Sequence, residues 1–139
     1  MKEPSFLYTA IDKAVKEEDM AIYSTNDALR NYIHIDDFTE IISRVIRKRI
    51  DGLYSCINEL DVSLPRVVKA IFAAFHPDSQ VIFIKELEDI QDNTFPYDDS
   101  LFKLIKCYPQ ISIEEGLKKL ASYWSIYSAI TNRKSVHVK

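Results

Sequence analysis

Apolar side chains recur at helical spacing along four stretches of the chain. In each stretch they lie three or four positions apart, which puts them on one face of a helix and leaves polar residues on the other. These stretches are residues 6–16, 38–49, 64–75 and 112–127. The segment "DDSLFKLI" predicts one further, short helix. The pattern therefore predicts five helices, four of them amphipathic.

Polar residues mark the ends of these predicted helices. Asp36 or Asp37 is placed to cap the second helix, and Ser112 with Glu115 forms a capping box at the start of the last one. Arginines and lysines between residues 44 and 49 fall in the last turns of the second helix, where positive charge suits the helix dipole. We therefore interpret this basic group as a helix end and not as a binding patch.

Short runs of β-branched and aromatic residues separate the helices and predict strands. These runs are residues 20–23, 29–35, 53–57 and 81–84. The run at 53–57 is apolar at almost every position, which is typical of a strand inside a sheet whose other strands lie outside this chain. Left alone, the edge of such a strand needs cover from a helix, a second copy or a partner chain.

The alternation of short strands and helices indicates a mixed α/β (α+β) domain. We expect residues 1–130 to form one domain, because a chain of 139 residues is of ordinary domain size. Residues 131–139 read as a basic tail, which we expect to be flexible.

Composition and charge exclude several classes of function. The net charge is −3 and no dense basic run is present, which argues against nucleic acid as the main partner. No apolar run approaches the roughly 20 residues that span a bilayer, and the N-terminus does not begin like a signal peptide. We therefore expect no membrane association and a cytoplasmic location. Cys56 and Cys107 lie in apolar segments, so we expect two buried free thiols.

The stretch "LRNYIHIDDF", residues 29–38, carries chemistry at alternate positions. In a strand, Arg30, Tyr32 and His34 share one face, opposite the apolar residues. A guanidinium can hold a phosphate through two parallel hydrogen bonds, and a tyrosine ring can stack on a base or sugar. The solvated face of a half-buried strand explains the same residues, and periodicity alone favours that simpler interpretation.

Three motifs together resemble one known family. "RNYIHIDDF" is similar to the Arg-Asp-Tyr-Ile-His-Val-x-Asp segment of the extended short-chain dehydrogenase/reductase family, the NAD-dependent sugar-nucleotide epimerases and dehydratases typified by UDP-glucose 4-epimerase. "GLYSCINELDVSL" and "YPQISIEEGLKKL" resemble two later segments of that family, in its order and spacing. The resemblance extends from about Ser5 to Trp124. It implies the C-terminal, substrate-binding part of the family, with the last strand and helix of its Rossmann sheet.

The resemblance also implies a nucleotide-sugar site. The family's arginine contacts the nucleotide diphosphate and a tyrosine lies in the same pocket, which assigns substrate binding to Arg30 and Tyr32. An aspartate of the family's acidic loop matches Asp89. Glu86 stands where the family has a second diphosphate arginine, and a glutamate there repels a diphosphate. We therefore expect weak binding through Arg30, Tyr32 and Asp89.

Other matched positions carry no chemistry of their own in this interpretation. His34 and Asp37 match family positions that look structural, and we expect His34 to be a hydrogen-bonded packing residue. His76 and His137 offer no plausible partner for a metal site with it, so no metal is expected.

The family's NAD site and catalytic pair are missing from this chain. The family binds NAD at a glycine-rich turn, which a chain with only two glycines cannot form. None of the eight tyrosines is followed by a lysine four residues later, which is the family's catalytic pair. We therefore expect no catalytic residue and no cofactor site here, although the parent family uses NAD.

Two functions remain open on these grounds. The first is a sugar-nucleotide-binding domain that is not active alone and whose partner is the missing N-terminal Rossmann half or a second copy. The alternative is a non-enzymatic interaction or oligomerisation module derived from the same fold.

Overall fold

The fold is that of a computed structural model, which describes residues 5–22, 28–83 and 92–135. Residues 84–91 lie outside the described part, and with them Asp89 and Glu86. The helices and strands follow one another in the order α1 (Phe6–Val15), β1 (Met20–Ile22), β2 (Leu29–Arg30), α2 (Ile35–Arg47), β3 (Val62–Ser63), α3 (Leu64–Phe75), β4 (Val81–Phe83), α4 (Ser100–Ile105) and α5 (Ile113–Ser135). The mixed α/β class predicted from the sequence is confirmed.

The described strands form two small sheets. β1 pairs with β4 in parallel, and β2 pairs with β3 in antiparallel fashion. Asn93 bridges Arg30 in parallel, and its backbone N–H donates to the carbonyl of Leu29 at 3.0 Å. β2 therefore lies between β3 and the segment around Asn93.

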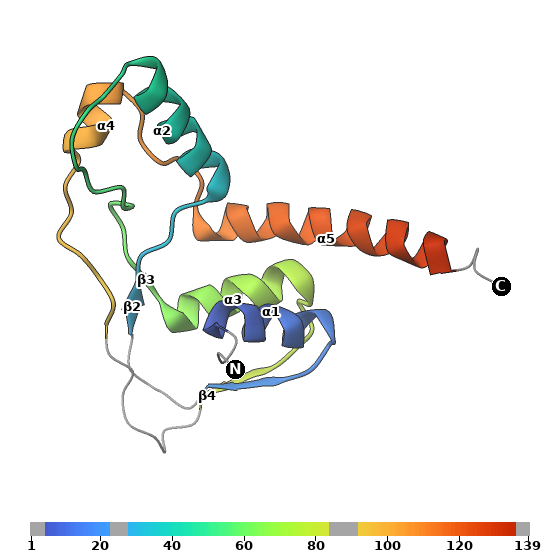
Figure 1. The fold of residues 1–139 in the computed structure, drawn as a ribbon. Coiled ribbons are helices and arrows are strands. Elements are labelled where there is room, and N and C mark those ends of the chain that lie inside the picture. The colour runs from blue at the N-terminus through green and yellow to red at the C-terminus, as the bar shows by residue number, and fades with distance from the viewer. Residues whose placement is uncertain (1–4, 23–27, 84–91, 136–139) are drawn as a thin grey trace.

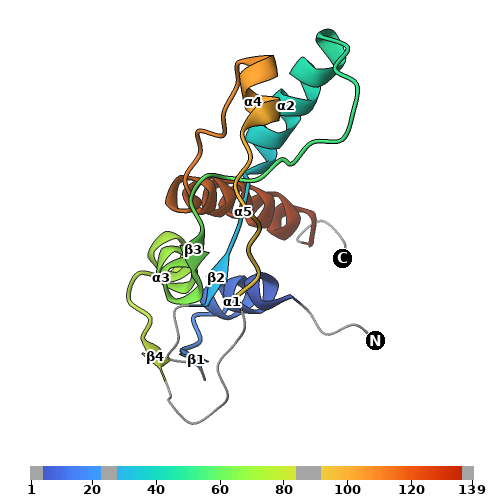
Figure 2. The same cartoon turned by 90° about the vertical axis from the view of Figure 1, so that its left-hand side faces the viewer.

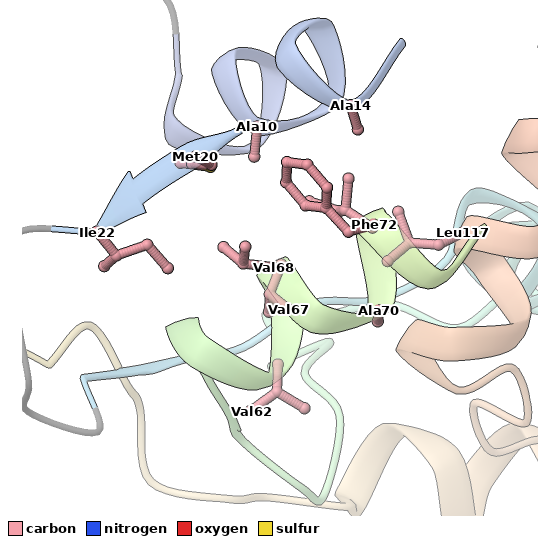
Figure 3. Close-up of a cluster of buried hydrophobic side chains, with 11 residues drawn as sticks. Ala10, Ala14, Met20, Ile22, Val62, Val67, Val68, Ala70, Phe72 and Leu117 are labelled. Carbon is pink, nitrogen blue, oxygen red and sulfur yellow. The ribbon is translucent and has the colours of Figure 1, made fainter. Parts of the chain in front are cut away.

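In the described part of the chain, buried apolar side chains form two clusters, each carried by its own group of elements. Figure 1 shows how these elements are arranged. The larger cluster joins α1, β1, α3 and the start of α5 (Figure 3). The smaller one joins α2 and α4 through Ile41, Leu101, Phe102 and Ile105. Figure 2, turned by 90°, also places α5 between the two groups, with α2 and α4 on one side and α1 and α3 on the other.

Most helix starts agree with the capping signals in the sequence. The Ser112 hydroxyl accepts from the backbone N–H of Glu115 at 3.2 Å, and the Glu115 carboxylate accepts from that of Ser112 at 3.1 Å. This reciprocal pair is the predicted capping box. α3 begins in the same way, since the Ser63 hydroxyl accepts from the backbone N–H of Arg66.

The predicted cap of α2 is wrong. His34 and not an aspartate is the N-cap, because its Nδ1 accepts from the backbone N–H of Asp36 at 3.1 Å. The Asp37 carboxylate instead accepts from the backbone N–H groups of Gln110 and Ile111, at 3.0 and 2.8 Å. Asp37 therefore ties α2 to the connection between α4 and α5.

The interpretation of the basic residues at the end of α2 agrees with their contacts. Arg44 bonds Glu40 at 2.6 Å and donates to the carbonyl of Lys106 at 3.0 Å, just after α4. Lys48 donates to the carbonyl of Leu104 at 3.2 Å. These cations thus satisfy carbonyl groups that the C-terminus of α4 leaves unpaired.

Two of the predicted strands differ from the structure. Residues 53–57 form neither strand nor helix, and Leu53 is 99% exposed, because no described strand lies beside them. The strand predicted at 29–35 ends at Arg30. From Asn31 onward, hydrogen bonds of side chains replace the backbone hydrogen bonds of a sheet. α5 continues beyond residue 127 to Ser135. Cys56 and Cys107 are free and only half-buried.

Candidate functional site

Asn31 fixes the chain between β2 and α2. Its amide nitrogen donates to the carbonyl of Asn58 at 2.9 Å and to the carboxylate of Asp61 at 2.8 Å. Its amide oxygen accepts from the backbone N–H of Asn58 at 2.9 Å. These hydrogen bonds hold residues 58–61 beside the chain, as backbone bonds to a neighbouring strand would. They also fix the position of the two residues that flank Asn31, namely Arg30 and Tyr32. The sequence gave no signal for this role, because the partners lie far along the chain.

The structure brings Arg30 and Tyr32 together. Both side chains are half-buried. Burial raises the pKa of the Tyr32 hydroxyl, and the nearby positive charge of Arg30 opposes that rise. One guanidinium nitrogen of Arg30 donates to the carbonyl of Leu29 at 2.8 Å, which orients the group beside β2. Tyr32 therefore stays a neutral phenol next to a fixed cation at neutral pH.

The third predicted site residue, Asp89, lies outside the described residues. Another carboxylate, that of Asp92, lies beside β2, where it accepts from the backbone N–H of Leu29 at 2.7 Å. Sequence reasoning missed Asp92, since a carboxylate that binds a distant backbone N–H leaves no local pattern. Its negative charge lies beside Leu29, the residue before Arg30, and weakens the attraction of this edge for anions.

A cavity of about 350 Å³ lies behind Tyr32. Its walls come from α1, the segments around β2 and β3, and the start of α5. The lining side chains are mostly apolar, and they include Leu7, Leu60, Val62, Ile113, Leu117 and Leu120. Tyr32, His34, Asn58 and Ser112 add polar groups, whereas Arg30 is not among the lining residues. The cavity suits an apolar or ring-shaped group, and a phosphate held by Arg30 would lie outside it.

His34 is a packing residue, as predicted. Besides capping α2, its ring lies against Gly116 in α5, where an added Cβ would come within 2.7 Å of the His34 Cδ2. Next to it, the Asp36 carboxylate accepts from the Lys119 ammonium at 2.8 Å. This contact lowers the pKa of Asp36 and raises that of Lys119. α2 and α5 are thus joined at the edge of the cavity.

Two further classes of site are absent from the part of the chain that the structure describes. No three of its His, Cys, Asp or Glu side chains gather closely enough to hold a metal ion. No described helix is both long enough and apolar enough to cross a membrane.

Solved structures of sugar-nucleotide enzymes share this fold. UDP-glucose 4-epimerase from Thermotoga maritima matches with a TM-score of 0.70 at 16% identity, over 91% of this chain and 41% of that one. UDP-N-acetylglucosamine 4-epimerase from Bacillus cereus matches with a TM-score of 0.76 at 11% identity, over 88% of this chain and 44% of that one. The chain has the fold of part of an epimerase or dehydratase. This confirms the resemblance to extended short-chain dehydrogenases/reductases at the level of the fold.

The epimerase/dehydratase fold is present only in part. dTDP-glucose 4,6-dehydratase from Bacillus anthracis matches with a TM-score of 0.61 at 15% identity, over 87% of this chain but 39% of that one. The chain thus spans about two fifths of the length of the structures it matches, which is consistent with a C-terminal fragment. No family model matches the sequence, and no curated protein matches it.

Proposed function

We propose that this chain is the sugar-nucleotide-binding part of an epimerase or dehydratase and is not active alone. The observation that carries the proposal is a tyrosine, Tyr32, that lines a cavity and feels the positive charge of Arg30, in a fold shared with such enzymes. One of these matching structures contains UDP-glucose and another contains UDP-N-acetylmuramic acid.

In this proposal Arg30 and Tyr32 divide the binding between them. Arg30 donates two parallel hydrogen bonds to the diphosphate. Tyr32, whose pKa is raised by burial, offers a neutral ring and hydroxyl to the nucleoside or sugar. Asp89 accepts hydrogen bonds from sugar hydroxyls. A single cation near Asp92 binds a diphosphate weakly, so the expected Kd is on the order of 1 mM.

The described residues do not fit NAD. A dinucleotide site needs glycines in a turn between a strand and a helix. Gly52 lies against the ring of Tyr54 in a segment without a strand, and Gly116 lies inside α5 against His34. Redox chemistry therefore belongs, in this proposal, to a separate Rossmann half.

Calorimetric titration with UDP and UDP-glucose tests the proposal. The unaltered chain is compared with Arg30→Ala, and with Arg47→Ala as a control that removes an equal charge from the surface of α2. We expect saturable heat that is lost in Arg30→Ala and kept in Arg47→Ala. Equal heat in both variants would mean binding at another place.

The second candidate is a non-enzymatic interaction module, and the exposed segment 53–57 favours it. Leu53 is almost fully exposed and Tyr54 is partly so, in a run whose composition suits a buried strand. If the unaltered chain gives no heat with either nucleotide, the ligand proposal fails and this candidate takes its place.

A further inference from the structure

A long stretch of α5 lacks charge although its large side chains are exposed. Residues 120–132 contain no Asp, Glu, Lys or Arg. Four large side chains within this stretch follow the i, i+3, i+4, i+7 spacing of one helix face, and they form what we call the α5 stripe. The α5 stripe consists of Tyr123, Ile126, Tyr127 and Ile130, which are 65%, 59%, 66% and 52% exposed. An isolated helix face of this kind is normally buried against another element.

The α5 stripe is distinct from the face that α5 turns toward the rest of the chain. Leu117 is buried in the larger cluster. The Trp124 ring packs edge-on against the Phe75 ring of α3, with 6.5 Å between the ring centroids. Figure 1 shows the C-terminal half of α5 extending away from the other elements. The motifs that resemble the family end near Trp124, so most of the α5 stripe lies beyond them. A surface built for the missing half of that family is therefore not the explanation we favour.

We propose that the α5 stripe pairs with the α5 stripe of a second copy of this chain, with the two helices antiparallel. The spacing is self-complementary, because an antiparallel pair centred between residues 126 and 127 places Tyr123 opposite Ile130 and Ile126 opposite Tyr127. From the exposed fractions, the pair covers about 1,000 Å² in all. This area is near the lower limit for a specific interface, so the expected Kd is on the order of 10 μM.

Charge favours the antiparallel orientation over the parallel one. α5 carries Glu114 and Glu115 in its first turn, whereas Arg133 and Lys134 fall at its other end. A parallel pair places the two basic ends side by side, where they repel. An antiparallel pair keeps the two basic ends apart, because residues 133 and 134 then lie opposite residues 120 and 119 of the other copy, about one helical turn from Glu115. The nearby Lys119 is already paired with Asp36.

Sedimentation of the full 139-residue chain over a range of concentrations tests this pairing. We expect a dimer that dissociates on dilution, and a loss of at least tenfold in affinity for Ile126→Glu. Ser125→Glu adds the same charge to the exposed opposite side of α5 and should leave the dimer intact. Circular dichroism checks that both variants keep their helix content.

Cross-linking distinguishes the orientations. The variants for this experiment have both native cysteines replaced by serine. In Ile126→Cys, the new thiols of the two copies lie close together in either orientation. In Tyr123→Cys, the two new thiols lie close together only in a parallel pair. The antiparallel register separates the two copies of position 123 by about 10 Å along the helix axis. We expect a disulfide dimer from Ile126→Cys and little from Tyr123→Cys.

Several results would overturn the proposal. A chain that stays monomeric at about 100 μM, tenfold above the expected Kd, has no such dimer. Binding of that monomer to vesicles of anionic lipid would assign the α5 stripe to a membrane surface instead. A dimer that survives Ile126→Glu but is lost in Leu53→Glu would place the interface at residues 53–57. Nucleotide binding plays no part in any of these outcomes, so they do not depend on the proposed ligand.

Discussion

The imidazole of His34 contacts two elements at once. It caps α2 through Nδ1, and its ring lies against the backbone of α5 at Gly116. A glycine inside a helix ordinarily costs about 1 kcal/mol relative to alanine. Here the missing side chain is the space that the histidine ring occupies, which gives a physical reason for a glycine at this point of α5.

Replacing this glycine should destabilise the chain despite the gain in helix propensity. The Cβ of Gly116→Ala would lie 2.7 Å from the His34 ring, so the ring must shift and lose its capping geometry. Overpacking of this kind costs about 1–3 kcal/mol, which outweighs the propensity gain of about 1 kcal/mol. Urea denaturation should show a net loss of free energy of unfolding. In a His34→Ala background the same replacement should stabilise, and an equal loss in both backgrounds would count against the steric explanation.

At this scale, some contacts between residues close in the sequence could be predicted, such as the cap of α5 but not that of α2, whereas contacts between distant residues could not. The capping box of Ser112 and Glu115 spans four residues, so its pattern is visible along the chain. Asn31 and Asp92 bind groups that the fold brings near, and the residues around them in the sequence give no sign of these contacts. Arg30 and Tyr32 were predicted by resemblance, because alternation alone fits a solvated strand equally well.

Among the helices, α3 and α5 are joined by an ion pair as well as by the core. Arg66 donates to both carboxylate oxygens of Glu114, through Nε at 2.7 Å and through the terminal nitrogen at 3.1 Å. This hydrogen bonding lowers the pKa of Glu114 and raises that of Arg66. The folded chain therefore favours the charged carboxylate.

The stability that Glu114 contributes should depend on pH. Because its pKa is lowered in the folded chain, the contribution is present above the ordinary value of 4.5 and is lost as pH falls below it. The pair is partly exposed, so Glu114→Gln should cost only about 0.5 kcal/mol at pH 7. Urea denaturation of both proteins at pH 7 and pH 3 measures the difference, which should be smaller at the lower pH. A difference that is as large at pH 3 as at pH 7 would point to packing.

The helices were easier to predict than the strands. Four amphipathic patterns and one short apolar group correspond to the five helices described, because a helix satisfies its backbone within one segment. A strand needs a neighbour. Residues 53–57 have the composition of a strand, but no described strand lies beside them. Beyond β2, hydrogen bonds of the Asn31 side chain replace those between two strands.

At the scale of the whole molecule, the buried apolar side chains of the described residues form two separate clusters. α2 and α4 enclose one cluster and α1, α3 and the start of α5 enclose the other. The links between them include Asp37 at the connection to α5 and the ion pair of Asp36 with Lys119. A chain with the fold of about two fifths of an epimerase keeps these local cores and leaves apolar residues such as Leu53 in solvent.

Replacing Leu53 tests whether a separate Rossmann half packs against residues 53–57. Its side chain is 99% exposed, so Leu53→Ser should change the free energy of unfolding of this chain by no more than about 0.5 kcal/mol. Leu101, which is buried between α2 and α4, provides the contrast, since Leu101→Ala should cost about 2–5 kcal/mol. If residues 53–57 complete a sheet with a Rossmann half, Leu53→Ser should nevertheless weaken binding to that half by at least tenfold.

The Rossmann half of a matching epimerase, such as that of Thermotoga maritima, is the natural first partner to mix with this chain. Binding measured by calorimetry, with the unaltered chain and Leu53→Ser side by side, separates the two proposed functions. An effect of Leu53→Ser on binding but not on folding means that Leu53 belongs to a surface that the chain cannot bury alone. Binding that does not depend on Leu53 would place the contact with the Rossmann half elsewhere on the chain, and absence of binding would favour the interaction module.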